Sequence, residues 1–264
     1  MYSDSLEHYG ILGMKWGVRR TPEQLGHHKI AKGTKVYRVT TKSKTNPFGA
    51  TYVTYLPPDR DLYRGSYSRV LKRNQGGNEK EKMVETEYEL TQELNIPSRS
   101  ELKQVFSKVM SDNKLKEKAC IALAENLVKS DQLDYMFNYG DDYEKHMTKD
   151  IKIFTKRYMD QFGTYTPDQA FALTARSLGS ASPIVKQAVI TELKNKGYNA
   201  MVDEAGVGGI VSPREGVEPL IVFDGAGSMS KVSSHELTDK ESSDADKRYK
   251  QWQSVARSNR NKPW

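Results

Sequence analysis

The sequence predicts an α+β fold in which strands near both ends of the chain enclose a helical middle. Stretches rich in β-branched and aromatic residues occur early and return after residue 198, whereas the apolar residues between them recur at helical spacing. Neither group of strands can bury an apolar face alone, so we expect both groups to join one sheet system. The 264 residues suit one large domain with shorter additions.

Five stretches are expected to form the strands. β-branched and aromatic residues dominate residues 36–40 and 51–55. Residues 83–90 alternate between apolar and polar as a half-buried strand does. The later strands are expected at residues 199–203 and 219–224, on the far side of the helical middle.

The middle of the chain, about residues 98–196, is expected to be a helical insert. Ser98 and Glu101 have the spacing of a capping box that begins a helix. Gly197 is a typical residue at the end of the last helix. Apolar residues recur at helical spacing between these limits, namely at Leu102, Val105, Phe106, Val109, Leu115, Ala119, Leu123, Leu127, Ile151, Phe154, Tyr158, Phe162, Val185, Val189 and Leu193.

Three parts are expected along the chain: a basic N-terminal segment at residues 1–32, the domain at 33–224 and a charged C-terminal tail at 225–264. The chain has 41 Lys and Arg against 34 Asp and Glu, a net charge of +7. Residues 1–44 hold nine of these bases and three acids. Such an arm can dock on an acidic protein surface or on nucleic acid, or it can be a solvated extension.

Composition excludes several kinds of site. The single cysteine, Cys120, excludes an intrachain disulfide and a cysteine-rich zinc site, and its apolar surroundings in the sequence indicate a core residue. The five histidines lack metal-ligand spacing, so no metal is expected. No apolar run approaches the roughly 20 residues that span a bilayer. We therefore expect a soluble protein without a membrane partner, working in a reducing cytoplasm or in a particle assembled there.

Several strand motifs resemble those of the ADP-ribosyltransferase superfamily, particularly its divergent branch in phage and mobile-element polyproteins. The resemblance covers residues 35–224 without the helical middle, and four fragments carry it in order: Val36-Tyr37-Arg38-Val39-Thr40, Gly49-Ala50-Thr51-Tyr52-Val53-Thr54, Lys196-Gly197-Tyr198-Asn199-Ala200-Met201-Val202 and Glu218-Pro219-Leu220-Ile221-Val222-Phe223-Asp224. It implies an ADP-ribosyltransferase-like split β-sandwich interrupted by a helical insert, with extended N- and C-terminal arms.

The same resemblance implies an NAD site. Arg38 would bind the pyrophosphate and adjoining ribose, because a guanidinium is a fixed fork of donors. Thr51, Tyr52 and Thr54 would orient the nicotinamide half. Glu218 would be the catalytic carboxylate, stabilising the cationic ribose that forms as nicotinamide leaves.

Each of these residues also has a structural interpretation. Arg38 can form a surface ion pair, residues 51–54 are ordinary strand formers and Glu218 can be a solvated carboxylate in a turn. Gly216 stands where many transferases of this kind carry an acid or a glutamine, and the second motif lacks its usual serine. These departures favour a non-catalytic domain.

The N-terminal segment carries a second resemblance. Glycines, a tryptophan and arginines crowd into residues 8–20, as in short linear binding segments anchored by Trp and Arg. The pattern resembles a short tag at the termini of otherwise unrelated tailed-phage proteins. The residues expected to bind a partner are His8, Gly10, Gly13, Lys15, Trp16, Gly17, Arg19 and Arg20.

Together the two resemblances imply a virion-associated protein of a tailed bacteriophage that attaches to the capsid or portal through residues 8–20. It would be found in the virion, and in the host bacterial cytoplasm during assembly or after delivery. One alternative is an active NAD-dependent mono-ADP-ribosyltransferase that modifies host proteins. A weaker alternative is a packaged protein that binds DNA through its basic arm.

Overall fold

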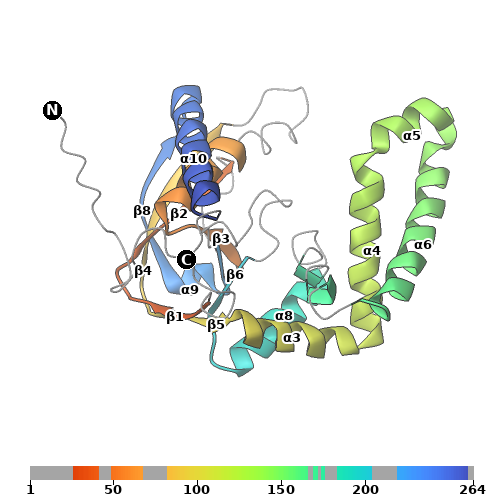
Figure 1. Cartoon of the computed structure of the whole chain (residues 1–264), viewed down its shortest axis with the longest axis horizontal. Helices are drawn as coiled ribbons and strands as arrows, with labels where there is room; N and C mark the ends of the chain where they lie inside the picture. The colour runs from red at the N-terminus through yellow and green to blue at the C-terminus, as the bar shows by residue number, and fades with distance from the viewer. Residues whose placement is uncertain are drawn as a thin grey trace.

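The computed structural model describes residues 26–41, 49–67, 82–165, 169–171, 174–175, 183–203 and 219–260. Across these residues the fold is α+β, as predicted, with strands gathered into one body and helices around it (Figure 1). The strands of the described part are β1 (Gly26–Ile30), β2 (Lys35–Thr41), β3 (Thr51–Val53), β4 (Met83–Leu90), β5 (Leu94–Ser98), β6 (Ala200–Val202), β7 (Leu220–Val222) and β8 (Met229–Glu236).

The described strands form two three-stranded antiparallel sheets and one two-stranded antiparallel pair, which meet at their edges. The first sheet has the order β2-β4-β8 and the second β3-β7-β6, with the pair β1-β5 beside β6. At the first seam Tyr37 and Thr54 exchange main-chain hydrogen bonds of 2.7 and 2.8 Å. At the other, the Asn95 N–H donates to Asn199 Oδ1 over 2.7 Å. The early and late strands therefore belong to one sheet system, which confirms the sequence prediction.

A single apolar core lies between the sheets and explains why they pack together. Alternation sends every second residue of a strand to the same face, and each strand contributes at least one residue to this core. Its buried members are Ile30, Val36, Val53, Tyr88, Leu90, Leu94, Ile96, Ala200, Val202, Leu220, Val222 and Met229.

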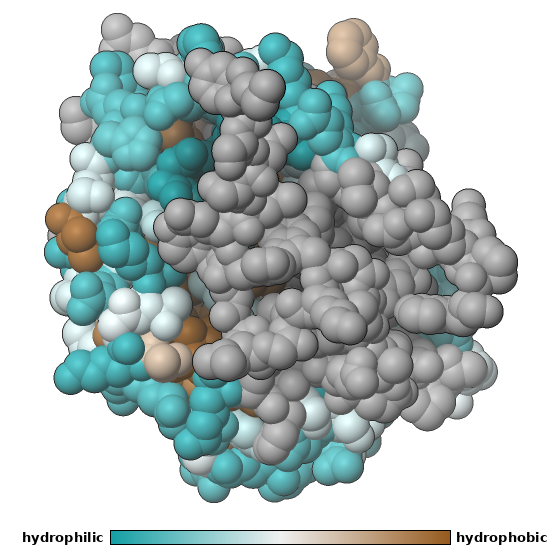
Figure 2. Space-filling view, turned by 60° about the vertical axis from the view of Figure 1, so that its left-hand side comes forward, coloured by the Kyte–Doolittle hydropathy of each residue, from teal (hydrophilic) through white to brown (hydrophobic). Residues whose placement is uncertain are grey.

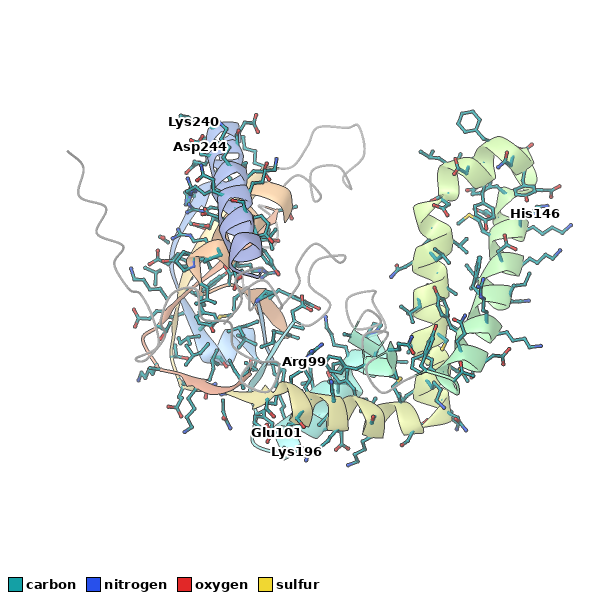
Figure 3. All side chains as sticks on the ribbon, in the orientation of Figure 1. Arg99, Glu101, His146, Lys196, Lys240 and Asp244 are labelled. Atoms are coloured by element: carbon teal, nitrogen blue, oxygen red, sulfur yellow. The ribbon has the colours of Figure 1, made fainter. Side chains whose placement is uncertain are left out.

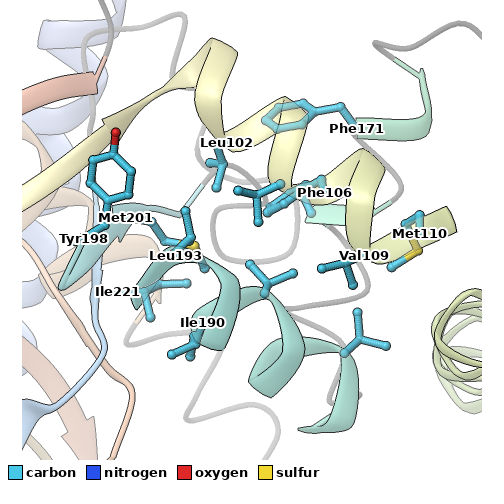
Figure 4. Packing of buried hydrophobic residues seen from close by; sticks show 14 of the residues in the cluster. Leu102, Phe106, Val109, Met110, Phe171, Ile190, Leu193, Tyr198, Met201 and Ile221 are labelled. Atoms are coloured by element: carbon cyan, nitrogen blue, oxygen red, sulfur yellow. The ribbon is translucent and has the colours of Figure 1, made fainter. Parts of the chain in front are cut away.

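Helices α3 (Arg99–Ser111) and α8 (Pro183–Asn195) cover the other face of the second sheet (Figures 1 and 4). The predicted capping box at the start of α3 is confirmed, because the Glu101 N–H donates to Ser98 Oγ and Glu101 accepts from the Ser98 N–H. Tyr198, at the approach to β6, donates to Glu101 Oε1 over 2.5 Å. The cap thus also ties the helical layer to the sheet.

The central helices form a hairpin that projects from the body (Figure 1). Its long arms are α4 (Asn113–Ser130) and α6 (Tyr143–Phe162), and its outer end is α5 (Gln132–Tyr139) followed by the turn η3 (Gly140–Asp142). Both arms are helical where predicted, but Leu127 of α4 is 39% exposed, and the predicted apolar residues of α6 are only partly buried. Cys120 is fully buried in α4, where burial raises the pKa of its thiol to about 11, in agreement with a core role.

The chain after residue 225 is part of the folded body, so the prediction of a charged tail there is wrong for residues 229–260. After α9 (Gly225–Ser228), strand β8 pairs with β4 along its whole length. Helix α10 (Asp239–Arg260) then packs on α1 (Pro57–Leu62) and η2 (Tyr63–Tyr67) over the outer face of the first sheet. The body also begins earlier than expected, with β1.

The surface of the described body is mainly hydrophilic on the face drawn in Figure 2, where apolar residues are scattered among polar ones. Residues 230–235 of β8 are exposed, and all of them except Val232 are polar. No helix in the described ranges is both long and apolar enough to cross a membrane.

Candidate functional site

The predicted docking segment and catalytic carboxylate lie outside the described residues. This holds for residues 8–20, with all eight predicted partner-binding residues, and for Glu218. Glu218 directly precedes Pro219, whose carbonyl accepts from the Asp203 N–H over 2.7 Å. Pro219, the residue after Glu218, therefore lies at the edge of the second sheet where β6 ends.

Arg38 lies in β2 on the face turned toward the inter-sheet core. It is in register with Thr86 on β4, which is in register with Ser234 on β8, and the hydroxyls of Thr86 and Ser234 are 2.8 Å apart. Burial raises the pKa of the neighbouring Tyr88, while the charge of Arg38 and a hydrogen bond to it act in the opposite sense. Arg38 is thus half-buried and lies in one row across the sheet with Thr86 and Ser234, which both carry hydroxyl groups.

The two threonines of the second motif are buried, each with 1% of its surface exposed. Thr51 Oγ1 donates to the Gly49 carbonyl and Thr54 Oγ1 to the Tyr37 carbonyl, each over 3.3 Å. Both hydroxyls therefore stabilise the edge of β3. While these hydrogen bonds hold, each hydroxyl can serve a ligand only as an acceptor.

Tyr52 lies on the opposite face of β3 from Thr51. Thr51 shares its face with Val53, which belongs to the inter-sheet core, whereas Tyr52 packs against the helical layer. Arg38 faces the inter-sheet core. The structure therefore does not bring Tyr52 together with Arg38 or with the Thr51 hydroxyl.

Tyr52 instead meets Lys186, a residue that the sequence analysis did not single out and that lies within reach of the charge of Asp203. The Lys186 ammonium from α8 lies 4.7 Å from the centre of the Tyr52 ring. Burial lowers the pKa of Lys186, and the negative charge of the buried Asp203 partly offsets that effect. The Lys186 ammonium thus has a cation–π contact with Tyr52 and feels the negative charge of Asp203.

The sequence contains a weak sign of this cluster. Lys186 interrupts the apolar series of Val185 and Val189 on α8, and Asp203 is a carboxylate at the end of an apolar strand. The separation of Lys186 and Asp203 along the sequence does not predict that they lie close together. Only the packing of α8 on β6 brings them together.

A second charged cluster lies on the outer face of the first sheet. The Glu85 carboxylate accepts from Arg60 Nη2 over 2.6 Å and from Arg64 Nε over 2.5 Å, and only 2% of its side chain is exposed. The Arg60 guanidinium lies 3.5 Å from the centre of the Tyr37 ring. Since these contacts fasten α1 and η2 to β2 and β4, we interpret the cluster as structural.

Burial alone would raise the pKa of the Glu85 carboxyl, but hydrogen bonds from Arg64 and Arg60 and their positive charges hold it below its ordinary value. Glu85 is therefore ionised at neutral pH. Among the described residues, no group of three or more His, Cys, Asp or Glu side chains has the arrangement of a metal site.

Comparison with known proteins gave a match for the N-terminal segment and for no other part of the chain. The model of a family of unknown function, DUF7211, matches residues 2–23. The match contains the whole of the predicted docking segment and ends before Gly26, where β1 begins. No curated protein matches the chain, and no solved structure matches it.

Proposed function

We propose that the chain is a virion-associated protein of a tailed bacteriophage, attached to the capsid or portal by residues 8–20, with a non-catalytic α+β body. The observation that carries this proposal is the position of the family match. It ends at residue 23 and the strands of the body begin at Gly26, so the matched segment is separate from the described body. A short segment of this kind suits attachment to a partner. Its resemblance to a tag of tailed-phage proteins indicates that the partner belongs to a phage particle.

The chemistry of the segment supports attachment to a protein. Trp16 has apolar neighbours at Ile11, Leu12 and Val18, and clustered apolar groups in a short segment are typical of an interaction site. The adjacent Arg19 and Arg20 would meet carboxylates at the rim of a groove.

The geometry of the body supports a non-catalytic role. The hydroxyls of Thr51 and Thr54 donate to main-chain carbonyls, and Tyr52 faces the helical layer while Arg38 faces the inter-sheet core. An NAD site of the family pattern needs these side chains in one cleft. The described arrangement favours a passive body that is carried by its docking segment.

The Trp16→Ala substitution is expected to remove the protein from particles at unchanged expression. Truncating a tryptophan at the centre of an interface often costs 2 kcal/mol or more, about thirtyfold in affinity. The measurement is the amount of protein in purified particles for the wild type, Trp16→Ala and a deletion of residues 2–23. Trp264→Ala is the matched control, since Trp264 lies outside the family match.

Incorporation of the deletion variant at the wild-type level would contradict the proposal. A loss that follows Arg19→Ala and Arg20→Ala alone, and that depends steeply on salt, would instead favour packaged DNA as the partner.

The half-buried Arg38 beside a row of hydroxyls favours NAD binding as a second candidate function. A non-catalytic body predicts no heat of NAD binding by calorimetry at millimolar concentrations. If the domain is an active transferase, Arg38→Ala should weaken NAD binding. Glu218→Gln should then keep NAD binding and lose turnover, because the carboxylate acts on charge that develops during the reaction. Arg157→Ala, on the hairpin, is the control. Binding with the active-transferase pattern would replace our proposal for the body but not for the segment.

A further inference from the structure

Helix α5, at the outer end of the hairpin, turns its apolar side to solvent. Leu133, Met136 and Phe137 follow helical i, i+3, i+4 spacing and share one face, with exposed fractions of 72%, 47% and 89%. We call these three residues the apolar ridge. A rigid ridge of this kind is typical of an interface.

The opposite face of α5 is fastened to α6, so the ridge has a defined orientation. The Tyr135 hydroxyl donates to Asp150 Oδ2 over 2.6 Å, a hydrogen bond that is the main cause of raising the pKa of Tyr135 to about 12. The Tyr139 ring stacks on His146 with 3.8 Å between ring centres. Figure 3 shows His146 near the outer end of the hairpin.

The surroundings of the ridge are acidic. Residues 131–144 contain no Lys or Arg. They contain five exposed carboxylates, namely Asp131, Asp134, Asp141, Asp142 and Glu144. A partner for this tip must supply an apolar hollow with positive charge around it.

The outer face of α6 offers such a surface further down the same hairpin. Lys145, Lys149, Lys152 and Lys156 recur every three or four residues and are exposed, and none of them forms an ion pair with a described residue. Beside them lies a shallow, wide-open hollow of about 660 Å³, which is lined by α6 and the residues just after it. Its lining residues are Lys152, Ile153, Lys156, Arg157, Asp160, Gln161 and Thr164, so the positive charge of three bases is partly offset by one carboxylate. Ile153 is 52% exposed in it.

The ridge and the hollow lie on one hairpin and are separated along it. From Tyr143 to Arg157 the helix rises about 20 Å at 1.5 Å per residue. The two surfaces therefore cannot meet within one chain. Between two copies related by a two-fold axis, a contact of the tip of one copy with the hollow of the other occurs twice.

We propose that the hairpin is a homodimerisation device in which the apolar ridge of one copy occupies the Ile153 hollow of a second copy. The carboxylates of the acidic tip meet Lys152, Lys156 and Arg157 across this interface. The occupant is a second copy because the same hairpin carries both complementary surfaces. The proposal is independent of docking by residues 8–20.

Sedimentation equilibrium of the full chain tests the proposal. The wild type is expected to form dimers whose dissociation constant rises with salt. Phe137→Ser and the pair Lys152→Glu with Lys156→Glu are each expected to raise that constant about tenfold or more. Ile184→Ser, at an exposed apolar residue on α8, is the matched control and should leave it unchanged.

Cysteine pairing tests the register of the two copies, since Cys120 is the single cysteine and is buried. A mixture of Phe137→Cys and Ile153→Cys proteins is expected to form disulfide-linked heterodimers under mild oxidation, and neither protein should link to itself. A wild type that stays monomeric at about 100 µM, a level at which even weak homodimers populate, would overturn the proposal. So would a dimer that Phe137→Ser leaves intact, or self-linking of either single variant.

Discussion

Replacing Glu85 by alanine is expected to lower the free energy of unfolding by about 3 kcal/mol, because it leaves two arginines without the carboxylate that they share. The side chains of Arg60 and Arg64 are only 29% and 17% exposed, so water replaces the lost contacts poorly. Urea unfolding of both proteins followed by circular dichroism measures the difference. The wild type and the variant should share the same slope against urea.

Glu93→Ala is the matched control for Glu85→Ala. Glu93 pairs with Lys29 over 2.7 Å, but the two side chains are 50% and 65% exposed. Exposed pairs contribute about 0–1 kcal/mol. An equal loss in the two variants would show that the Glu85 cluster does not hold α1 and η2 on the sheet.

The same cluster predicts a pH dependence. Because the folded state holds the pKa of Glu85 below its ordinary value, its contribution is complete above the unfolded pKa and falls as pH drops through the folded pKa. The wild type should therefore lose stability relative to Glu85→Gln below about pH 4. A constant difference between the two proteins from neutral pH into that range would contradict this assignment.

Deleting residues 239–264 is expected to abolish cooperative unfolding of the body. This deletion removes α10, whose buried residues Ala245, Asp246 and Tyr249 cover η2 and the outer face of the first sheet. Helix and η2 approach so closely that a Cβ on Gly65 would lie 2.9 Å from the Asp246 Cα. The measurement is the thermal transition followed by near-ultraviolet circular dichroism.

Deleting residues 2–23 is the comparison for the α10 deletion, since it removes a segment of similar length from the other end. If this segment is a docking unit, the transition should keep its midpoint. A protein without α10 that unfolds cooperatively at the wild-type midpoint would restore the interpretation of residues 225–264 as a tail.

The sequence predicted five of the described strands from their apolar and β-branched residues, and it did not predict β1, β5 and β8. Alternation in residues 83–90 predicts β4 because Tyr88 and Leu90 enter the core between the sheets. In β8 the residues after Met229 are polar except for the exposed Val232, and hydrogen bonds to β4 define the strand. Local pattern carries no information on that pairing.

The candidate site was harder to predict than the fold for a related reason. Sequence motifs place Thr51 and Thr54 in a strand, but their hydroxyl partners depend on the seam between β2 and β3. The meeting of Lys186 with Tyr52 depends on how α8 packs on the second sheet. Such contacts arise from tertiary packing between segments that are far apart in the chain.

The most direct test of the proposed function is the amount of an unrelated reporter protein in purified particles when residues 1–23 are fused to it. The account predicts that the reporter is incorporated with this segment and not with the same segment carrying Trp16→Ala. Equal amounts of reporter in particles with the wild-type segment, with the substituted segment and without any segment would contradict it.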